Sequence, residues 1–113
     1  MDEYIQYYVV NKSLEMSKGR MSAQVAHGAT ISAMVLGDCD YFKEWFDNNQ
    51  KKVILQGSEN DMYKILFNVA NSFLVKDNGL TEIPKDSMTV VVLPPMKRLE
   101  AKQYVKRLQL YKG

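Results

Sequence analysis

The sequence is poor in the residues that build disulfides and metal sites. It contains one cysteine, Cys39, and one histidine, His27, among 113 residues. A single cysteine excludes an internal disulfide and fits a reducing compartment. These two potential ligands lack partners at the spacing of a metal site, and a Cys39–His27 nucleophilic pair lacks a third, orienting group. We therefore expect no bound metal and no other cofactor.

Long hydrophobic runs and export signals are also missing. No apolar run approaches the length that spans a bilayer, and the first residues, MDEYIQYYVV, are acidic where a secretory signal is basic. We expect a cytoplasmic protein without membrane contact. The phosphate-binding loop and the dinucleotide fingerprint are absent as well, so nucleotide hydrolysis and hydride transfer lose their usual support. The length predicts one domain, residues 1–113.

Positive charge is concentrated near the C-terminus. From residue 96 onward there are six cations and one acid, Glu100, whereas the preceding residues carry nine cations and twelve acids; the six are Lys97, Arg98, Lys102, Lys106, Arg107 and Lys112. One interpretation is a surface that faces an anionic polymer. The other is a solvated, merely basic helix face, and the sequence leaves both open.

Strand and helix patterns alternate along the chain. Apolar and β-branched runs predict strands at 4–10, 51–57, 73–77 and 87–93. Helices are predicted at 18–36, 41–50 and 58–73, and after Pro94 and Pro95. Ser17 is the expected N-cap of the first helix, Gly37 its C′ residue, and Ser58 with Asp61 resembles a capping box. This order predicts an α/β fold with helices on both faces of a small sheet whose first two strands are parallel.

Two polar segments follow predicted strands. Residues 11–19 leave the first strand, and Asp77-Asn-Gly-Leu-Thr81 leaves the third. Ligands of such sheets bind beyond the carboxyl ends of the strands, so the two segments meet if the third strand runs parallel to the first. An acid near hydroxyl and cationic groups outlines an ester-hydrolysis site. The alternative is that Asn-Gly simply forms a two-residue hairpin turn.

The helix at 18–36 has an unusual composition. Small residues at positions 23, 26 and 29 allow close packing, and Gln24 and His27, three apart, are expected to share a face. Lys18 and Arg20 stand at its start. A lone histidine on a helix is more often structural than functional, and the spacing alone does not decide between the two.

Two stretches together carry a family resemblance. The two stretches are KGRMSAQVAHGA, residues 18–29, and DNGLTEIPKDSMTVVVLPP, residues 77–95. They resemble two characteristic segments of the peptidyl-tRNA hydrolase 2 family. The resemblance covers essentially the whole chain, in order and with similar spacing. It implies hydrolysis of the ester between a peptide and the 3′ end of tRNA, a mixed four-stranded sheet in a three-layer α/β arrangement, no metal, and a homodimer.

The resemblance also implies a set of site residues. Asp77 would hold or deprotonate the attacking water, and Lys18, with help from Thr81, would stabilise the oxyanion or the leaving oxygen. Gln24 and His27 would orient these groups, and His27 stays open as an alternative general base. Expected contacts to tRNA phosphates come from Arg20, Lys51 and Lys52, with the C-terminal cations behind them.

The sequence departs from the family pattern at three positions. Gln56 stands where a lysine usually ends the second strand, Asp86 where glycine is common, and Gly28 where alanine is common. Gly28 is expected to cost about 1 kcal/mol of helix stability relative to alanine. Loss of the lysine charge supports a different hypothesis, a domain that binds tRNA or a protein partner without turnover.

Overall fold

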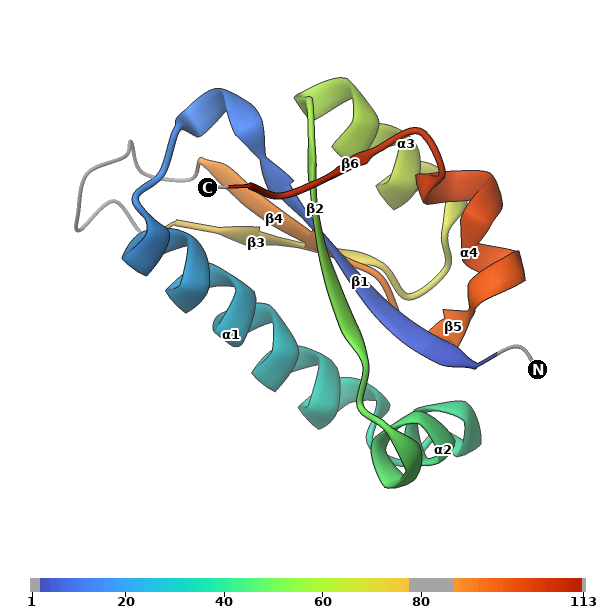
Figure 1. The fold of residues 1–113 in the computed structure, drawn as a ribbon. Coiled ribbons are helices and arrows are strands. Elements are labelled where there is room, and N and C mark those ends of the chain that lie inside the picture. The colour runs from blue at the N-terminus through green and yellow to red at the C-terminus, as the bar shows by residue number, and fades with distance from the viewer. Residues whose placement is uncertain (1–2, 78–86, 113) are drawn as a thin grey trace.

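β1 (Tyr4–Asn11) lies at the centre of a mixed sheet in the computed structural model, which describes residues 3–77 and 87–112 (Figure 1). The strand order is β3–β4–β1–β2–β6, with β5 paired to β1. The other strands are β2 (Lys52–Gly57), β3 (Phe73–Lys76), β4 (Met88–Val92), β5 (Met96–Lys97) and β6 (Gln109–Leu110). The helices of the described residues are α1 (Lys18–Leu36), α2 (Asp40–Asn48), α3 (Glu59–Asn68) and α4 (Arg98–Val105), and Lys12–Leu14 form a 3₁₀ turn.

Strand directions bring three carboxyl ends to one edge of the sheet. β1 pairs with β2 in parallel, as predicted, and with β4 antiparallel. β3 pairs antiparallel with β4, and it therefore runs in the same direction as β1. The condition that the sequence left open is met, because the segments that follow β1 and β3 leave the sheet at the same edge.

β1 supplies side chains to both faces of the sheet, since successive residues of a strand point to opposite sides. Tyr7 and Val9 pack with the buried residues of α3 and α4. Tyr8 and Val10 pack with the half-buried residues of α1. The two apolar clusters are thus separated by the sheet, with α1 and α4 on opposite sides of it (Figure 1).

The described residues form six strands, two more than the predicted four. β5 and β6 have two residues each, too few to show an alternating pattern. β5 also delays the last helix, which begins at Arg98 and not directly after Pro95. α3 ends at Asn68, five residues earlier than predicted. Gly37 ends α1 with right-handed angles (φ −56°, ψ −24°), so it is not the left-handed C′ residue expected.

The predicted helix starts are confirmed. The Ser17 side chain accepts a hydrogen bond from the Arg20 N–H at 3.1 Å, and α1 begins at the predicted residue. Ser58 and Asp61 form a complete capping box at the start of α3. The bonds that Asp61 accepts from Ser58 lower the pKa of its carboxyl group. Each cap supplies acceptors to N–H groups that have no partner within the helix.

A buried polar network ties α1 to the sheet. The Gln6 side-chain N–H₂ donates to Ser32 Oγ at 2.9 Å and to the Leu93 carbonyl at 3.0 Å. The Tyr8 hydroxyl donates to Gln6 Oε1, and burial raises the pKa of Tyr8, so the hydroxyl keeps its proton. Because buried polar groups are costly without partners, this network favours one position of α1 over the sheet.

Gly28 lets α1 approach the sheet closely. A Cβ atom at this position would lie 2.5 Å from Val92 Cγ2 and 3.3 Å from Val75 Cγ2. Val92 is fully buried and its side chain is stiff at χ1, so it has little freedom to move away. The expected cost of glycine in the helix is therefore offset by the packing it allows.

We predict that Gly28→Ala destabilises the protein despite the better helix propensity of alanine. The gain of about 1 kcal/mol is outweighed by overpacking, which costs about 1–3 kcal/mol. Urea denaturation of the variant measures the change. In a Val92→Ala background the same substitution is expected to be neutral or stabilising, and a stabilised single variant would contradict this packing account.

Candidate active site

The edge at the carboxyl ends of β1 and β3 gathers the polar segments singled out in the sequence. Asp77 directly follows β3, and α1 begins nearby at Lys18. The Asp77 N–H donates to the Ser87 carbonyl at 3.1 Å, and Lys76 is paired with Met88. Residues 78–86 therefore connect the two antiparallel strands, and the alternative of an Asn-Gly turn lies outside the described residues.

Asp77 is a buried acid with a cationic partner. It is 1% exposed, and its Oδ2 lies 3.2 Å from Nη1 of Arg20, whose side chain is 17% exposed. Removing a carboxylate from water costs several kcal/mol, and a cation at contact distance offsets much of that cost. The first turn of α1 thus supplies a positive charge to the end of β3.

Gln24 lies one turn further along α1 and also faces the sheet. It is buried, and its Oε1 lies 3.0 Å from the Thr89 hydroxyl on β4. The same hydroxyl lies 2.7 Å from the Val75 carbonyl on β3. Thr89 therefore connects α1 to both strands beside the Arg20–Asp77 pair.

Asn11, at the end of β1, orders the segment that leads into α1. Its side-chain N–H₂ donates to the Met88 carbonyl at 2.9 Å, and its Oδ1 accepts from the Ser13 N–H at 2.9 Å. Glu15 then turns the chain with φ 49°. These contacts lead the chain to the Ser17 cap, and so they set where Arg20 stands.

The roles of Asn11 and Thr89, and the pairing of Arg20 with Asp77, are not among the expectations from the sequence. Asn11 and Thr89 do carry a signal, because each is a polar residue in a largely apolar strand and needs a partner when buried. The pairing of Arg20 with Asp77 depends on the direction of β3, which no local pattern predicts.

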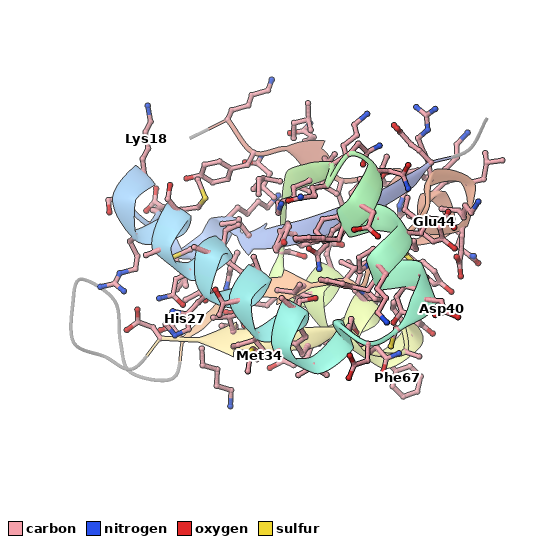
Figure 2. All side chains as sticks on the ribbon, turned by 90° about the horizontal axis from the view of Figure 1, so that it is seen from below. Lys18, His27, Met34, Asp40, Glu44 and Phe67 are labelled. Carbon is pink, nitrogen blue, oxygen red and sulfur yellow. The ribbon has the colours of Figure 1, made fainter. Side chains whose placement is uncertain are left out.

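His27 and Lys18 are exposed residues of α1. Figure 2 shows their side chains pointing in different directions from the helix. They are nine positions apart, which is about two and a half helical turns, so their side chains leave opposite sides of the helix. Gln24 and His27 both lie in α1, three residues apart as expected, but Gln24 is buried against the sheet whereas His27 is exposed. Within the described residues, neither Lys18 nor His27 forms a hydrogen bond or ion pair with Asp77.

Lys51 and Lys52 lie at the opposite edge of the sheet, where β2 begins. Lys51 Nζ is 3.1 Å from Glu3 Oε1, and Lys52 Nζ lies 4.9 Å from the centre of the Trp45 ring. The structure does not bring these two lysines to Asp77. Thr81 and Asp86 lie outside the described residues.

Gln56 stands near the carboxyl end of β2. It is half-buried and pairs in register with Gln109 of β6, and its side-chain N–H₂ donates to Gln109 Oε1 at 3.4 Å. A neutral amide thus stands at the position where the family resemblance led us to expect a lysine, and its partner Gln109 is also an amide.

In residues 3–77 and 87–112, no three His, Cys, Asp or Glu side chains gather in a way that could hold a metal ion. Over the same residues, no helix combines the length and the apolar character required to cross a membrane.

Known proteins resemble the chain over nearly its whole length. The family model described as peptidyl-tRNA hydrolase PTH2 matches residues 4–111. A peptidyl-tRNA hydrolase of Thermococcus onnurineus is 35% identical over 102 residues, which is 84% of this chain and 86% of the relative. One from Methanococcus maripaludis is 32% identical over 115 residues, covering 95% and 98% of the two chains. The resemblance predicted from the two stretches is therefore confirmed, and this chain belongs to the peptidyl-tRNA hydrolase PTH2 family.

Proposed function

We propose that the protein hydrolyses the ester bond between peptide and tRNA in peptidyl-tRNA, releasing free tRNA and free peptide. The observation that carries this proposal is a buried carboxylate, Asp77, paired with Arg20 at the carboxyl edge of the sheet in a member of this family. Water attacks the ester carbonyl, the bond to the ribose oxygen breaks, and that oxygen leaves with a proton.

Asp77 is our candidate for the group that takes the proton of the attacking water. A general base must lie within hydrogen-bond reach of that water, in a site where its orientation is held. Arg20 contacts one oxygen of the Asp77 carboxylate. The Asp77 N–H donates to the Ser87 carbonyl, which fixes the backbone at Asp77. The exposed position of His27 favours Asp77 over His27 as the base, and leaves His27 an orienting role at most.

Lys18 is our candidate for stabilising the negative charge that develops on the oxyanion or the leaving oxygen. Its ammonium group is exposed and has no ion-pair partner among the described residues, so its flexible stem can turn toward a bound ester. Thr81 is proposed to assist it. Gln24, fixed by Thr89, is proposed to orient these groups. No step of this scheme requires a metal or another cofactor.

Arg20 receives a different role from the one the sequence predicts. Its guanidinium contacts Asp77, so we assign it to hold that carboxylate in place of binding a tRNA phosphate. Lys51 and Lys52 remain candidates for phosphate contacts, although each already has a partner within the chain.

A binding domain without turnover is the other hypothesis that the sequence leaves open. Gln56 is the feature that supports it. Against it, the relatives that match the chain are named peptidyl-tRNA hydrolases, and the buried acid and its cation are present. Hydrolysis is therefore the function that the observations support best.

A homodimer in the cytoplasm is the further expectation from the family resemblance. The second half of α1 supports the dimer, because it exposes three apolar side chains: Ile31 (39%), Met34 (83%) and Val35 (71%). Met34 projects from α1 in Figure 2. Sedimentation equilibrium of the wild type and of Met34→Lys tests this proposal, and a wild-type monomer would contradict it.

We predict that Asp77→Asn lowers the rate of peptidyl-tRNA hydrolysis by about 10²–10⁴-fold, the contribution typical of general-base catalysis. The asparagine keeps the shape of the side chain but cannot accept the proton. Release of N-blocked amino acids from tRNA is the measurement, with Asp47→Asn on the exposed surface of α2 as the matched control.

Thermal unfolding must show that the Asp77→Asn variant stays folded, since it leaves Arg20 without its anionic partner. A folded variant with wild-type turnover would overturn the role assigned to Asp77. A folded wild type that binds tRNA but releases no amino acid would support the inactive binding domain.

Neutralising Lys18 is expected to lower kcat by about 10²–10³-fold, because a cation aimed at developing negative charge contributes several kcal/mol to the transition state. The substrate KM should change little, since the interaction forms chiefly in the transition state. Steady-state kinetics of Lys18→Ala, beside Lys43→Ala on α2, measure both constants. A rise in KM with kcat unchanged would instead assign Lys18 to binding.

A further inference from the structure

α4 carries three cations on one side and an open groove beside them. Arg98, Lys102 and Lys106 follow one another at intervals of four residues, which places them along one face of the helix. The groove has a volume of about 650 Å³. The groove is lined by the buried residues Tyr7, Leu55 and Val105, by the exposed Leu99, and by the three cations.

The buried lining of the groove is apolar, and its exposed lining combines Leu99 with the three cations. Tyr7, Leu55 and Val105 are each at most 8% exposed, whereas the three cationic residues are exposed. The aliphatic stem of a lysine or arginine can cover apolar surface while its charged end stays in water. This arrangement holds three positive charges in a row above the sheet.

These charges are not balanced by nearby acids. Within residues 3–77 and 87–112, the side chains of Arg98, Lys102 and Lys106 form no ion pair, and the one acid of α4, Glu100, lines a different hollow beside Pro94 and Pro95. Asp61 lines an adjoining hollow with Lys106, but its carboxylate accepts bonds from Ser58.

The start of α4 is also a costly place for positive charge. The helix dipole disfavours cations in the first turn, yet α4 begins with Lys97 as N-cap and Arg98 as the first residue. The N-cap makes no side-chain hydrogen bond. Lys97 Nζ lies 4.9 Å from the centre of the Tyr4 ring, and Lys102 and Lys106 lie in the last turn and at the C-cap, where the dipole favours cations. Helix stability therefore leaves only Arg98 unaccounted for, and binding of an anion accounts for it.

We propose that this groove binds the sugar-phosphate backbone of the tRNA part of the substrate, an inference that rests on the proposed function. Residues four apart on a helix rise by about 6 Å, a spacing comparable to that of successive phosphates on one strand. Such contacts carry no sequence information, which suits an enzyme that accepts many tRNAs. The groove lies on the face of the sheet opposite α1, so it contacts the RNA body and not the ester (Figure 1).

The partner that the charges favour is RNA and not an acidic protein. Regularly spaced phosphates complement a regular row of cations, and the proposed substrate brings RNA to the protein in every turnover. Lys51 and Lys52, the other candidates, are engaged with Glu3 and Trp45, whereas the three α4 cations have no such partners among the described residues.

The test is the triple variant Arg98→Gln, Lys102→Gln, Lys106→Gln. We expect its Kd for deacylated tRNA to rise about 10- to 100-fold at low salt, and the slope of log K against log salt to flatten by about 2 to 3, as three lost phosphate contacts require. The KM for peptidyl-tRNA should rise with it while kcat at saturation stays near the wild-type value. The matched control, Arg98→Lys, Lys102→Arg, Lys106→Arg, keeps the charges and should bind tRNA as the wild type does.

Three results would overturn the proposal. One is an unchanged Kd and salt slope in the triple glutamine variant. Another is loss of tRNA binding in Lys51→Gln, Lys52→Gln with none in the α4 variant. The third is polyglutamate binding that depends on the α4 cations while tRNA binding does not. A wild type that binds tRNA through α4 but hydrolyses nothing would support the groove and contradict the proposed function.

Discussion

The buried ion pair between Arg20 and Asp77 is the interaction on which the rest of the site depends. It joins the first turn of α1 to the residue after β3, two segments far apart in the sequence. A carboxylate that is 1% exposed needs such a partner, because breaking a buried pair by removing one side costs about 3–5 kcal/mol. The carboxylate that we propose as the general base is therefore held in place by the contact that joins α1 to the end of β3.

Several independent features place the two partners. The Asn11 and Ser17 side chains order the segment before α1, so that Arg20 falls in the first helical turn. Gly28 allows the helix to lie directly against Val92, and the Gln6–Ser32 hydrogen bond sets its position over the sheet. The position of Arg20 relative to Asp77 thus depends on packing along the whole interface between α1 and the sheet.

Local sequence patterns predicted the strands and helices better than the contacts between them. Apolar runs predicted β1 and β2, and the Ser17 cap predicted the start of α1, because each depends on neighbouring residues alone. β5 and β6 are held by pairing with β1 and β2, and two residues leave no pattern to read. The spacing of Gln24 and His27 does not show which of them the sheet covers, and the structure buries Gln24 and leaves His27 exposed. Asp77 was found through the family resemblance, whereas its pairing with Arg20 needed the strand directions.

The most direct test of this account is a double-mutant cycle in hydrolysis with Arg20→Met, Asp77→Asn and the double variant. If Arg20 acts by holding Asp77, its loss lowers kcat/KM by about 10-fold or more when Asp77 is present, and by less than about 3-fold when Asp77 is already asparagine. Single-turnover release of N-blocked amino acids from tRNA measures all four proteins. An equal loss in both backgrounds would contradict the account, because Arg20 would then act on the substrate independently of Asp77.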